Sequence, residues 1–587
     1  MPQLKHLSIA IMKLHHFVDV MMIMTYLSYI PVAFSSLPSI SAISAASEQE
    51  ENAVAKPNRH LQETPVTPPL KCKNSDSKLQ LELETVGGST IPFYCEWAKK
   101  GNYACSGTGA LASHCPATCK SCSRYRCADS EGRFIWKGEA RTCDWLAAKS
   151  TRSKKKLCRK KPELATTCRA TCNVCGDTKT VWEQVGQDLV GEAFNDSSGF
   201  SVSLSADGST VAIGALGNDD GGYYAGHVRV HRQNVTSEEW EQIGQDIDGD
   251  YYYDYSGERV SISADGDIVA IAATGNDGNS TNATDVGHVR VFKYDASYSN
   301  GRWVKMGQDI DGDYNNGYSG VGLSLSADGT TVGIGAPNSL YGRGHARVYK
   351  YNVATGQWEQ KGQDIEGEGY YDNSGDSVSI SSDGNRVAIG AFGNDGDTYY
   401  SGKDLGHVRI YLYIDSSDRW EQLGQDIDGE SSNDVSGTSV SLSADGSRVA
   451  VGAPSNYGFN GYYSGHVRIH EYNDNSGQWE QIGKDVDGES EYDGSGRSVS
   501  ISADGSRVAI GATSNSNDSG YYSGHARIYE YNNSGQWEQI GKDLDGQNDD
   551  DFSGVSVSIS TDGNTVAVGA PEIKSGNGYV RIFHQAV

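Results

Sequence analysis

Aliphatic residues alternate with small polar residues at the start of the stretch SVSISADGSRVAIGA, which occupies residues 498–512. A period of two residues is typical of a β-strand, and the Asp-Gly pair that follows indicates a tight turn. RVAIGA then predicts a second strand, GHARIYEY (524–531) a third, and WEQIGKD (537–543), after a turn at NNSGQ, a fourth. The pattern therefore predicts a four-stranded antiparallel unit without an amphipathic helix.

This unit occurs seven times between residues 178 and 587. The Asp-Gly turns begin at Asp207, Asp265, Asp328, Asp383, Asp445, Asp504 and Asp562. A tryptophan recurs every 55 to 63 residues, at Trp182, Trp240, Trp303, Trp358, Trp420, Trp479 and Trp537. Repetition of a four-stranded unit on this scale predicts an all-β, seven-bladed β-propeller with four-stranded antiparallel blades.

The two ends of the array complement each other. The array opens on a lone fourth strand, VWEQVGQDL (181–189), and ends on a lone third strand, GYVRIF (578–583). Pairing of these two segments would complete the last blade, close the ring and remove an exposed sheet edge. An open solenoid would instead need polar capping repeats at its ends, and the sequence contains none.

The first 71 residues have a different character. Basic residues precede an apolar stretch at 17–34, and small residues follow at 35–47, so residues 1–45 are interpreted as a signal peptide, with an uncleaved membrane anchor as the alternative. The signal pattern improves if translation starts at Met12. Residues 46–71 are polar and Pro-rich, which is typical of a linker.

All 12 cysteines fall in two modules, 72–122 and 127–175, each with six. Modules of this size need covalent cross-links, and cysteines behind an apolar N-terminus indicate disulfides and an oxidising compartment. The endings CPATCKSC and CRATCNVC resemble the ShKT domain. That resemblance implies the pairs Cys72–Cys122, Cys95–Cys115, Cys105–Cys119, Cys127–Cys175, Cys143–Cys168 and Cys158–Cys172. The spacing itself leaves fifteen pairings open per module, and zinc at the C-x2-C ends is the alternative.

The repeats also resemble a known family. SGTSVSLSADGSRVAVGAP (436–454) is similar to FG-GAP repeats, the blades of the integrin α-subunit head, and the GAP tripeptide occurs at 335–337, 452–454 and 569–571. The resemblance implies seven blades and a role in adhesion. Calcium-binding FG-GAP hairpins carry several acidic residues in the first turn, whereas ADGS has one aspartate, too few oxygens for calcium. Calcium at these hairpins is therefore not expected.

Charge and motifs restrict the function. Lys and Arg total 49 and Asp and Glu 76, giving a net charge of −27, which argues against a nucleic-acid partner. H-E-x-x-H, G-x-S-x-G and phosphate-binding glycine loops are absent from the sequence, so catalysis has little support. Asn-x-Ser/Thr sequons at Asn195, Asn234, Asn279, Asn282, Asn517 and Asn532 are compatible with a glycoprotein.

The long, variable connections join strand two to three and strand four to the next blade, and in a propeller both emerge on one face. They are rich in Asp, Asn, Gly and paired tyrosines, a composition typical of recognition surfaces. We predict a binding face that includes Tyr223, Tyr224, Tyr252, Tyr399, Tyr400, Tyr462, Tyr463, Tyr521 and Tyr522. The alternative is that these tyrosines only pack over blade edges.

Acidic and basic residues recur with the repeat. Asp246, Asp248, Asp250 and Asp254 are weak candidates for a calcium site. Seven third-strand arginines are instead expected to form bidentate pairs with fourth-strand aspartates. The arginines are Arg229, Arg290, Arg347, Arg409, Arg468, Arg527 and Arg581, and the aspartates are Asp188, Asp246, Asp309, Asp364, Asp426, Asp485 and Asp543. Histidines at His227, His288, His345, His407, His466 and His525 are interpreted as structural, because copies on opposite sides of a ring lie too far apart to share one metal.

Together these features predict a secreted or cell-surface binding or adhesion protein that uses the loop-rich face to recognise a protein or glycan. The alternatives are a secreted hydrolase with a propeller catalytic domain and a structural wall or matrix component. No cofactor is expected beyond a possible calcium ion, and a membrane contact is expected only if the N-terminal segment is an anchor.

Overall fold

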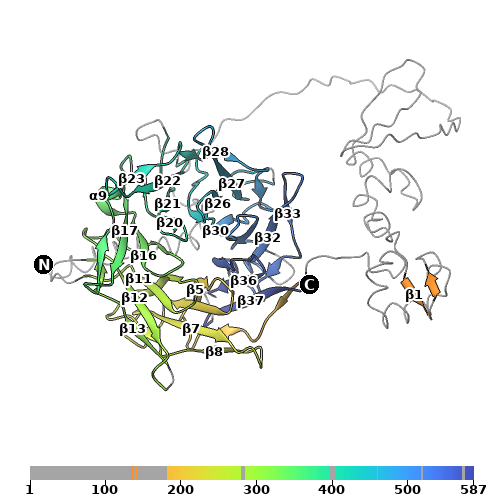
Figure 1. Ribbon diagram of the computed structural model, residues 1–587, viewed down its shortest axis with the longest axis horizontal. Helices are drawn as coiled ribbons and strands as arrows, with labels where there is room; N and C mark the ends of the chain where they lie inside the picture. The colour runs from red at the N-terminus through yellow and green to blue at the C-terminus, as the bar shows by residue number, and fades with distance from the viewer. Residues whose placement is uncertain are drawn as a thin grey trace, which may run out of the picture. The chain divides into compact units, whose positions relative to one another are not determined.

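The computed structural model describes residues 134–136, 139–141 and 181–586, except 279–283, 300, 397–403, 459, 517–519 and 572–575. Seven antiparallel sheets follow one another in a closed ring, so the predicted seven-bladed β-propeller is confirmed (Figure 1). Separately, β1 (Phe134–Trp136) and β2 (Glu139–Arg141) pair as an antiparallel hairpin within the second cysteine module. The predicted signal segment, linker and six disulfides lie outside the described residues.

Each blade contains four strands in meander order. The first strands are β5 (Ser198–Leu204), β10 (Ser256–Ile262), β15 (Gly322–Leu325), β20 (Ser377–Ile380), β25 (Ser439–Leu442), β30 (Ser495–Ile501) and β35 (Ser556–Ile559). The second strands are β6 (Thr210–Ala215), β11 (Ile268–Ala273), β16 (Thr331–Ala336), β21 (Arg386–Ala391), β26 (Arg448–Ala453), β31 (Arg507–Ala512) and β36 (Thr565–Ala570). The third strands are β7 (His227–Gln233), β12 (His288–Asp295), β17 (His345–Asn352), β22 (His407–Ile414), β27 (His466–Asn473), β32 (His525–Tyr531) and β37 (Tyr579–Ala586).

The fourth strand differs from its predicted form because it is split in two. Its first segments are β8 (Trp240–Gln242), β13 (Arg302–Lys305), β18 (Gln357–Gln360), β23 (Arg419–Gln422), β28 (Gln478–Gln481), β33 (Trp537–Gln539) and β3 (Val181–Gln184). Its second segments are β9 (Ile247–Asp248), β14 (Ile310–Asp311), β19 (Ile365–Glu366), β24 (Ile427–Asp428), β29 (Val486–Asp487), β34 (Leu544–Asp545) and β4 (Leu189–Val190). A glycine with positive φ interrupts the strand between the two segments, for example Gly244 at 75°.

The ring closes as predicted. Strand β3 pairs antiparallel with β37, with Val181 opposite Ala586, and β4 pairs with the other end of β37. The N-terminal segment of the array thus supplies the fourth strand of the last blade. No sheet edge is left open between the first and last repeats.

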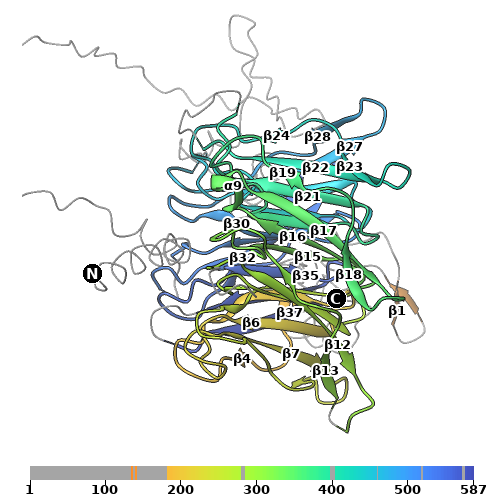
Figure 2. The ribbon, with the colours of Figure 1, turned by 90° about the vertical axis from the view of Figure 1, so that its left-hand side faces the viewer.

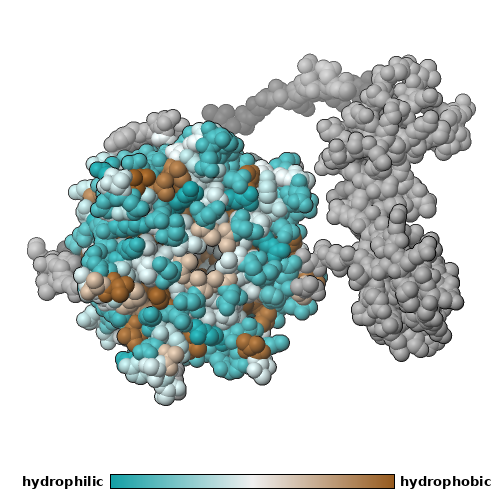
Figure 3. Space-filling view, in the orientation of Figure 1, coloured by the Kyte–Doolittle hydropathy of each residue, from teal (hydrophilic) through white to brown (hydrophobic). Residues whose placement is uncertain are grey.

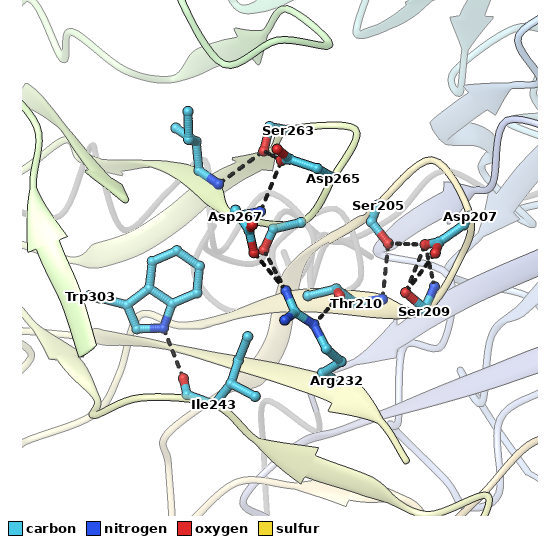
Figure 4. Close-up of polar contacts among 12 residues, drawn as sticks. Ser205, Asp207, Ser209, Thr210, Arg232, Ile243, Ser263, Asp265, Asp267 and Trp303 are labelled. Carbon is cyan, nitrogen blue, oxygen red and sulfur yellow. Dashed lines mark hydrogen bonds and ion pairs between the residues drawn. The ribbon is translucent and has the colours of Figure 1, made fainter. Parts of the chain in front are cut away.

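The Asp-Gly turn is stabilised by its own side chains. The Asp207 carboxylate accepts hydrogen bonds from the Ser205 hydroxyl (2.7 Å) and the Ser209 backbone N–H (2.9 Å) (Figure 4). Burial opposes the charge of Asp207, but these hydrogen bonds outweigh it and lower the pKa of the carboxyl group. Within this turn, only Gly208 has a positive φ, at 71°. The aspartate therefore serves the turn through its side chain.

The turns between the first and second strands of successive blades form hydrogen bonds with each other around the axis. The backbone N–H of Ala206 donates to the carbonyl of Ala264, whose own N–H donates to Ala327 in the next blade. The remaining bonds continue from Ala327 to Ser382, Ala444, Ala503 and Thr561, and from Thr561 back to Ala206. A second set joins first-strand serines to the next blade, as in Ser203 Oγ, which accepts from the Ile262 N–H at 3.1 Å. Small polar residues of SVSIS thus link neighbouring blades.

A third set of contacts joins the blades at their outer strands. The Trp303 indole N–H donates to the Ile243 carbonyl of the preceding blade at 2.8 Å (Figure 4). The Gln245 side chain bonds both the N–H and the carbonyl of Trp303, each at 3.0 Å. The seven tryptophans of the repeats all donate in this way, and five have the glutamine clasp. Lys484 and Lys542 replace the glutamine at the other two interfaces.

The hydrophobic core lies between neighbouring blades. Val230 of one blade packs in the same cluster as Val269 and Trp303 of the next. Both valines are fully or almost fully buried, and burial of each such side chain contributes about 1.5–3 kcal/mol. The alternation of aliphatic residues in all strands therefore serves sheet-to-sheet packing around the ring.

Helix is almost absent from the described part of the chain. The one four-residue element, α9 (Ser339–Gly342), lies in a connection between second and third strands. Its Leu340 and Tyr341 have positive φ, so it is an irregular turn. Nothing in the described segments forms an apolar helix of membrane-spanning length.

Candidate binding face

The variable connections lie together on one face of the ring, here named the loop face. It comprises the connections between second and third strands and those from the fourth strand to the next blade, while the opposite, hairpin face carries the other two turns. Figure 2 shows α9 on one side and the β12–β13 hairpin toward the other. Backbone hydrogen bonds join the two kinds of connection, because Tyr253 N–H donates to the Tyr223 carbonyl (3.0 Å) and Tyr255 N–H to the Tyr224 carbonyl (3.2 Å).

The same two-loop unit recurs in two further blades. Tyr492 N–H donates to the Tyr462 carbonyl at 2.8 Å, and Asp550 N–H donates to the Tyr521 carbonyl at 2.8 Å. The Tyr-Tyr pairs are therefore fixed by main-chain bonds on both residues. Such a unit has little backbone conformational entropy left to lose on binding.

The two tyrosines of each pair have different roles. The second one, at Tyr224, Tyr463 and Tyr522, is half-buried and has positive φ. Each stacks on an aromatic ring of the following connection, as in Tyr224 on Tyr253, where the centroids are 6.2 Å apart, and Tyr522 on Phe552, at 6.0 Å. For these three residues the structure favours the packing alternative.

The first tyrosine of each pair is the more exposed one, although Tyr223 also makes edge contacts with Tyr224 (4.5 Å) and Tyr253 (5.5 Å). Tyr223 is 51% exposed, Tyr462 57% and Tyr521 74%. Tyr252 of the predicted set is 69% exposed, and its neighbour Tyr251 and the unpredicted Tyr492 are exposed as well. Tyr399 and Tyr400 lie outside the described residues. The loop face thus carries a set of exposed tyrosines on backbones held by hydrogen bonds.

The calcium candidates have separate partners. Asp254 is buried, and its Oδ2 accepts from the backbone N–H groups of Asp250 (3.2 Å) and Tyr251 (3.0 Å) and from the Asn276 side chain (3.1 Å). Asp250 pairs with Arg290 at 2.9 Å, and Asp246 accepts from Gln242 at 2.5 Å. The backbone carbonyl of Asp248 accepts a hydrogen bond from Arg290 Nη2 at 2.7 Å. Asp254 therefore stabilises the connection, and the described residues do not join these four in one ligand group.

The third-strand arginines have other partners than predicted at six of seven positions. Only Arg347 makes the bidentate pair, with Nε 2.9 Å and Nη2 2.7 Å from the Asp364 carboxylate. The others donate through Nη2 to a backbone carbonyl of the preceding blade, as Arg409 does to Glu366 at 2.8 Å. These carbonyls belong to Val190, Asp248, Glu366, Asp428, Asp487 and Asp545. The arginine is placed across the blade interface, which the spacing of a single repeat does not reveal.

The fourth-strand aspartates mostly accept from the residue four positions earlier. Gln422 donates to Asp426 Oδ1 at 2.6 Å, and Lys305 forms an ion pair with Asp309 at 2.5 Å. The same glutamine contact occurs at Asp188, Asp246, Asp364, Asp485 and Asp543. One carboxylate oxygen is thus used locally at these positions, while the second oxygen of Asp188 accepts from Gln547 and that of Asp364 from Arg347.

The third-strand histidines gather carboxylates around them at four interfaces. In three equivalent groups, named the triads, a glutamate, a histidine and an aspartate each place one ligand atom within 4.8 Å of the others. The triads are Glu368–His407–Asp426, Glu430–His466–Asp485 and Glu489–His525–Asp543. The fourth group is Glu192–Asp220–His227. The glutamates come from the connection that precedes the blade of the histidine, so sequence spacing within one repeat could not show these groups.

Electrostatics at the triads favour a neutral imidazole among carboxylates. Burial first, and Arg409 second, lower the pKa of His407 to about 4. Burial raises the pKa of Glu368, Arg409 lowers it, and neighbouring aspartates raise it further. The same causes act on Glu430 and Glu489 with Arg468 and Arg527. One guanidinium at each triad thus faces several acidic groups.

The visible face of the propeller is predominantly hydrophilic, except close to its axis. Figure 3 shows polar residues over most of the visible face, with residues of intermediate hydropathy around a central hollow. This agrees with the acidic composition, in which acidic residues outnumber basic ones by 76 to 49.

Comparisons with known proteins give the chain no family. No family model matches it, and no curated protein matches it. Two solved structures with 13% sequence identity are putative 6-phosphogluconolactonases from Bacteroides uniformis and Bacteroides fragilis. Each has a TM-score of 0.41, with 60% and 61% of this chain and 86% of each neighbour covered. These values are too low to transfer an activity.

Proposed function

We propose that this chain is a secreted or cell-surface binding protein whose loop face recognises another macromolecule, with a protein partner favoured. The observation that carries the proposal is the set of exposed tyrosines on loops joined by main-chain hydrogen bonds. Tyr252 and Tyr521 are 69% and 74% exposed, while the loops beneath them are fixed. Rigid tyrosines among Ser, Gly and Asn are typical of protein-recognition surfaces.

Charge complements this composition. The connections on the loop face carry Asp219, Asp220, Asp250 and Glu368, and the whole chain has a net charge of −27. Opposite charge on the partner would accelerate association and select against acidic competitors. The proposed partner therefore presents a basic or neutral surface.

The resemblances read from the sequence belong to this proposal. Seven four-stranded blades are the architecture that the FG-GAP resemblance implies, and adhesion is the role it implies. The ShKT-like modules, the disulfides and the exported location remain part of the proposal as well. They are supported by the cysteine spacing and the apolar N-terminal segment alone.

The test compares two sets of surface substitutions in the full-length protein. Tyr223→Ser, Tyr252→Ser, Tyr462→Ser and Tyr521→Ser are combined in one variant, and all four side chains are more than half exposed. A matched control carries Val235→Ser, Tyr298→Ser and Val353→Ser in the hairpins of the opposite face, where exposure is 94%, 50% and 82%. Partners are identified by affinity capture from extracellular protein and on a glycan array.

We expect the tyrosine variant to bind a captured partner at least about 10-fold more weakly, since truncated aromatic anchors cost 1–2 kcal/mol or more. The control variant should bind like the unmodified protein. Equal binding by all three proteins would exclude the loop face as the recognition surface. Selective binding on the glycan array would indicate that the partner is a glycan and not a protein. Product release from either ligand would indicate a hydrolase.

A further inference from the structure

The three triads share a geometry that the hydrogen bonds of the propeller do not explain. His407 is 1% exposed and begins its strand at the loop face, while the side chains of Asp426 and Glu368 are 30% and 52% exposed. The imidazole is thus buried, while both carboxylates beside it are partly exposed to solvent. His466 and His525 are also 1% exposed and have equivalent neighbours.

One ring nitrogen of each of these histidines lacks a hydrogen-bond partner. It is Nε2 of His407, His466 and His525, and Nε2 of His288 and both ring nitrogens of His227 are buried without a partner as well, so the neighbouring carboxylates distinguish the triads. Nδ1 of His407 lies 3.8 Å from Asp426 Oδ2, which is beyond hydrogen-bond distance. Buried polar atoms without a partner are rare in folded proteins, because no hydrogen bond offsets the loss of their hydration.

The guanidinium of each triad does not close the site. Arg409 Nη1 lies 3.6 Å from Glu368, Arg468 Nη1 lies 3.8 Å from Glu430, and Arg527 Nη1 lies 3.5 Å from Glu489. Each arginine is engaged mainly by the backbone carbonyl of the preceding blade. Around Glu368, three aspartates besides the glutamate itself oppose the one arginine, namely Asp372, Asp426 and Asp428.

The other interfaces of the ring provide natural contrasts. Asp250 and Asp313 replace the glutamate at two of them, and these shorter side chains form close ion pairs with Arg290 (2.9 Å) and Arg347 (2.5 Å). In the same two interfaces the fourth-strand aspartate is also neutralised, since Asp309 pairs with Lys305 and Asp364 with Arg347. At these two interfaces a cationic side chain thus forms an ion pair with each of the two carboxylates.

The interface that precedes the last blade lacks both the glutamate and the histidine of the triad. Gln547 takes the place of the glutamate and Tyr579 that of the histidine, and the Gln547 side chain donates to the remaining Asp188 at 3.1 Å. The Tyr579 hydroxyl donates to Asp551 at 2.5 Å. Where the histidine is absent, the polar groups are therefore paired directly.

We propose that the three triads are binding sites for divalent transition-metal ions, with Zn²⁺ as the preferred ion. One neutral imidazole and two carboxylates are ligands that Zn²⁺ accepts, and three protein ligands leave a fourth position for water. An ion about 2.0–2.2 Å from each atom requires a separation of at most about 4.4 Å. The half-exposed glutamate supplies the small closing movement from the 4.8 Å limit within which the ligand atoms lie.

The experiment measures zinc bound by the full-length protein under non-reducing conditions. After treatment with EDTA and dialysis, the protein is equilibrated with Zn²⁺, and bound metal is counted by mass spectrometry and titration calorimetry. The variants are His407→Gln, His466→Gln, His525→Gln and their combination. The control is His288→Gln, at an interface where Lys305 pairs with Asp309 at 2.5 Å.

We expect each single variant to lose one bound zinc ion and the combined variant to lose three, while the control keeps the full number. Zinc held by cysteines would contribute equally to all variants and cancel in the difference. Zn²⁺ should also raise the thermal midpoint of the unmodified protein. The increase should be much smaller for the combined variant.

A second set of variants covers the case that a buried glutamine impairs folding. Glu368→Gln, Glu430→Gln and Glu489→Gln change side chains that are 52%, 45% and 44% exposed. They should keep the circular dichroism spectrum and weaken zinc binding at the three sites at least about 10-fold. Unchanged zinc content in folded histidine and glutamate variants, or no zinc bound by the unmodified protein at micromolar concentrations, would overturn the proposal.

Discussion

The two faces of the propeller differ in how uniform their connections are. On the hairpin face, seven nearly identical Asp-Gly turns bond to each other in an unbroken ring around the axis. On the loop face, each blade presents a different connection, fixed by its own hydrogen bonds and aromatic stacking. The comparison teaches that uniform sequence in this chain serves closure of the ring, whereas variable sequence carries the candidate binding groups.

The largest effect should come from breaking the outer contacts that support closure. Trp303→Ala removes a side chain that is 2% exposed, its packing against the preceding blade and its bond to the Ile243 carbonyl. We expect a loss of about 3–5 kcal/mol in the free energy of unfolding. Chemical denaturation of the full-length protein measures it. Tyr252→Ser on the loop face, with a side chain 69% exposed, is the control and should change stability by less than about 0.5 kcal/mol.

A second test uses two buried histidines on third strands. Burial first, with Arg229 or Arg468 second, lowers the pKa of His231 to about 4 and that of His470 to about 3. In the unfolded chain both titrate near 6.5, so the unfolded state binds more protons below that pH. Their contribution to stability is thus present above pH 6.5 and decreases as the pH falls toward 4, by up to about 3 kcal/mol each.

Replacing these histidines should reduce the acid sensitivity. Other blades hold Phe292, Tyr349, Tyr411, Tyr529 and Phe583 at this strand position, so the site accepts an aromatic ring. His231→Phe with His470→Tyr should therefore reduce the dependence of the thermal midpoint on pH between 6.5 and 4, to which His407 and the other buried third-strand histidines still contribute. His584→Gln, at an exposed position, serves as control. A slope that stays the same in the double variant would show that other groups govern the acid response.

The smallest effect concerns the glutamine clasp, which five interfaces have and two lack. Gln308→Leu removes both bonds to the Trp358 backbone, at 2.8 and 2.9 Å, and should cost about 1–3 kcal/mol. In the opposite direction, Lys484→Gln should supply the missing clasp at Trp537 and stabilise the protein by about 0.5–1.5 kcal/mol. Thermal unfolding checks both. Destabilisation by Lys484→Gln would mean that the lysine interface has a geometry of its own.

The fold was accessible from the sequence because its signals repeat. Seven copies of a four-stranded unit are indicated independently by the alternation in SVSIS, by the Asp-Gly turns and by the spaced tryptophans. The unmatched strands at 181–189 and 578–583 indicated how the ring closes. The split of the fourth strand was missed, because WEQIGKD reads as one strand until the neighbouring tryptophan is known. A Cβ at Gly244 would lie 2.7 Å from Trp303 Cδ1 of the next blade, which explains the glycine.

The candidate sites were only partly accessible. The sequence indicated the tyrosine-rich connections, but it did not separate the exposed Tyr223 from the stacked Tyr224, because that difference depends on Tyr253 in a later segment. The predicted arginine partners held at Arg347 alone, since the other arginines extend to a carbonyl of the preceding blade. The triads were missed for the same reason, as Glu368 and His407 belong to different repeats.

The sequence by itself thus determined the content of each blade, the number of blades and the order of their strands, because these depend on local alternation and turn chemistry. Only the tertiary structure decided which polar groups of neighbouring blades meet. The residues of one interface are contributed by two or three repeats, and their distance depends on how the sheets pack around the axis. The candidate binding face and the proposed metal triads depend on that packing.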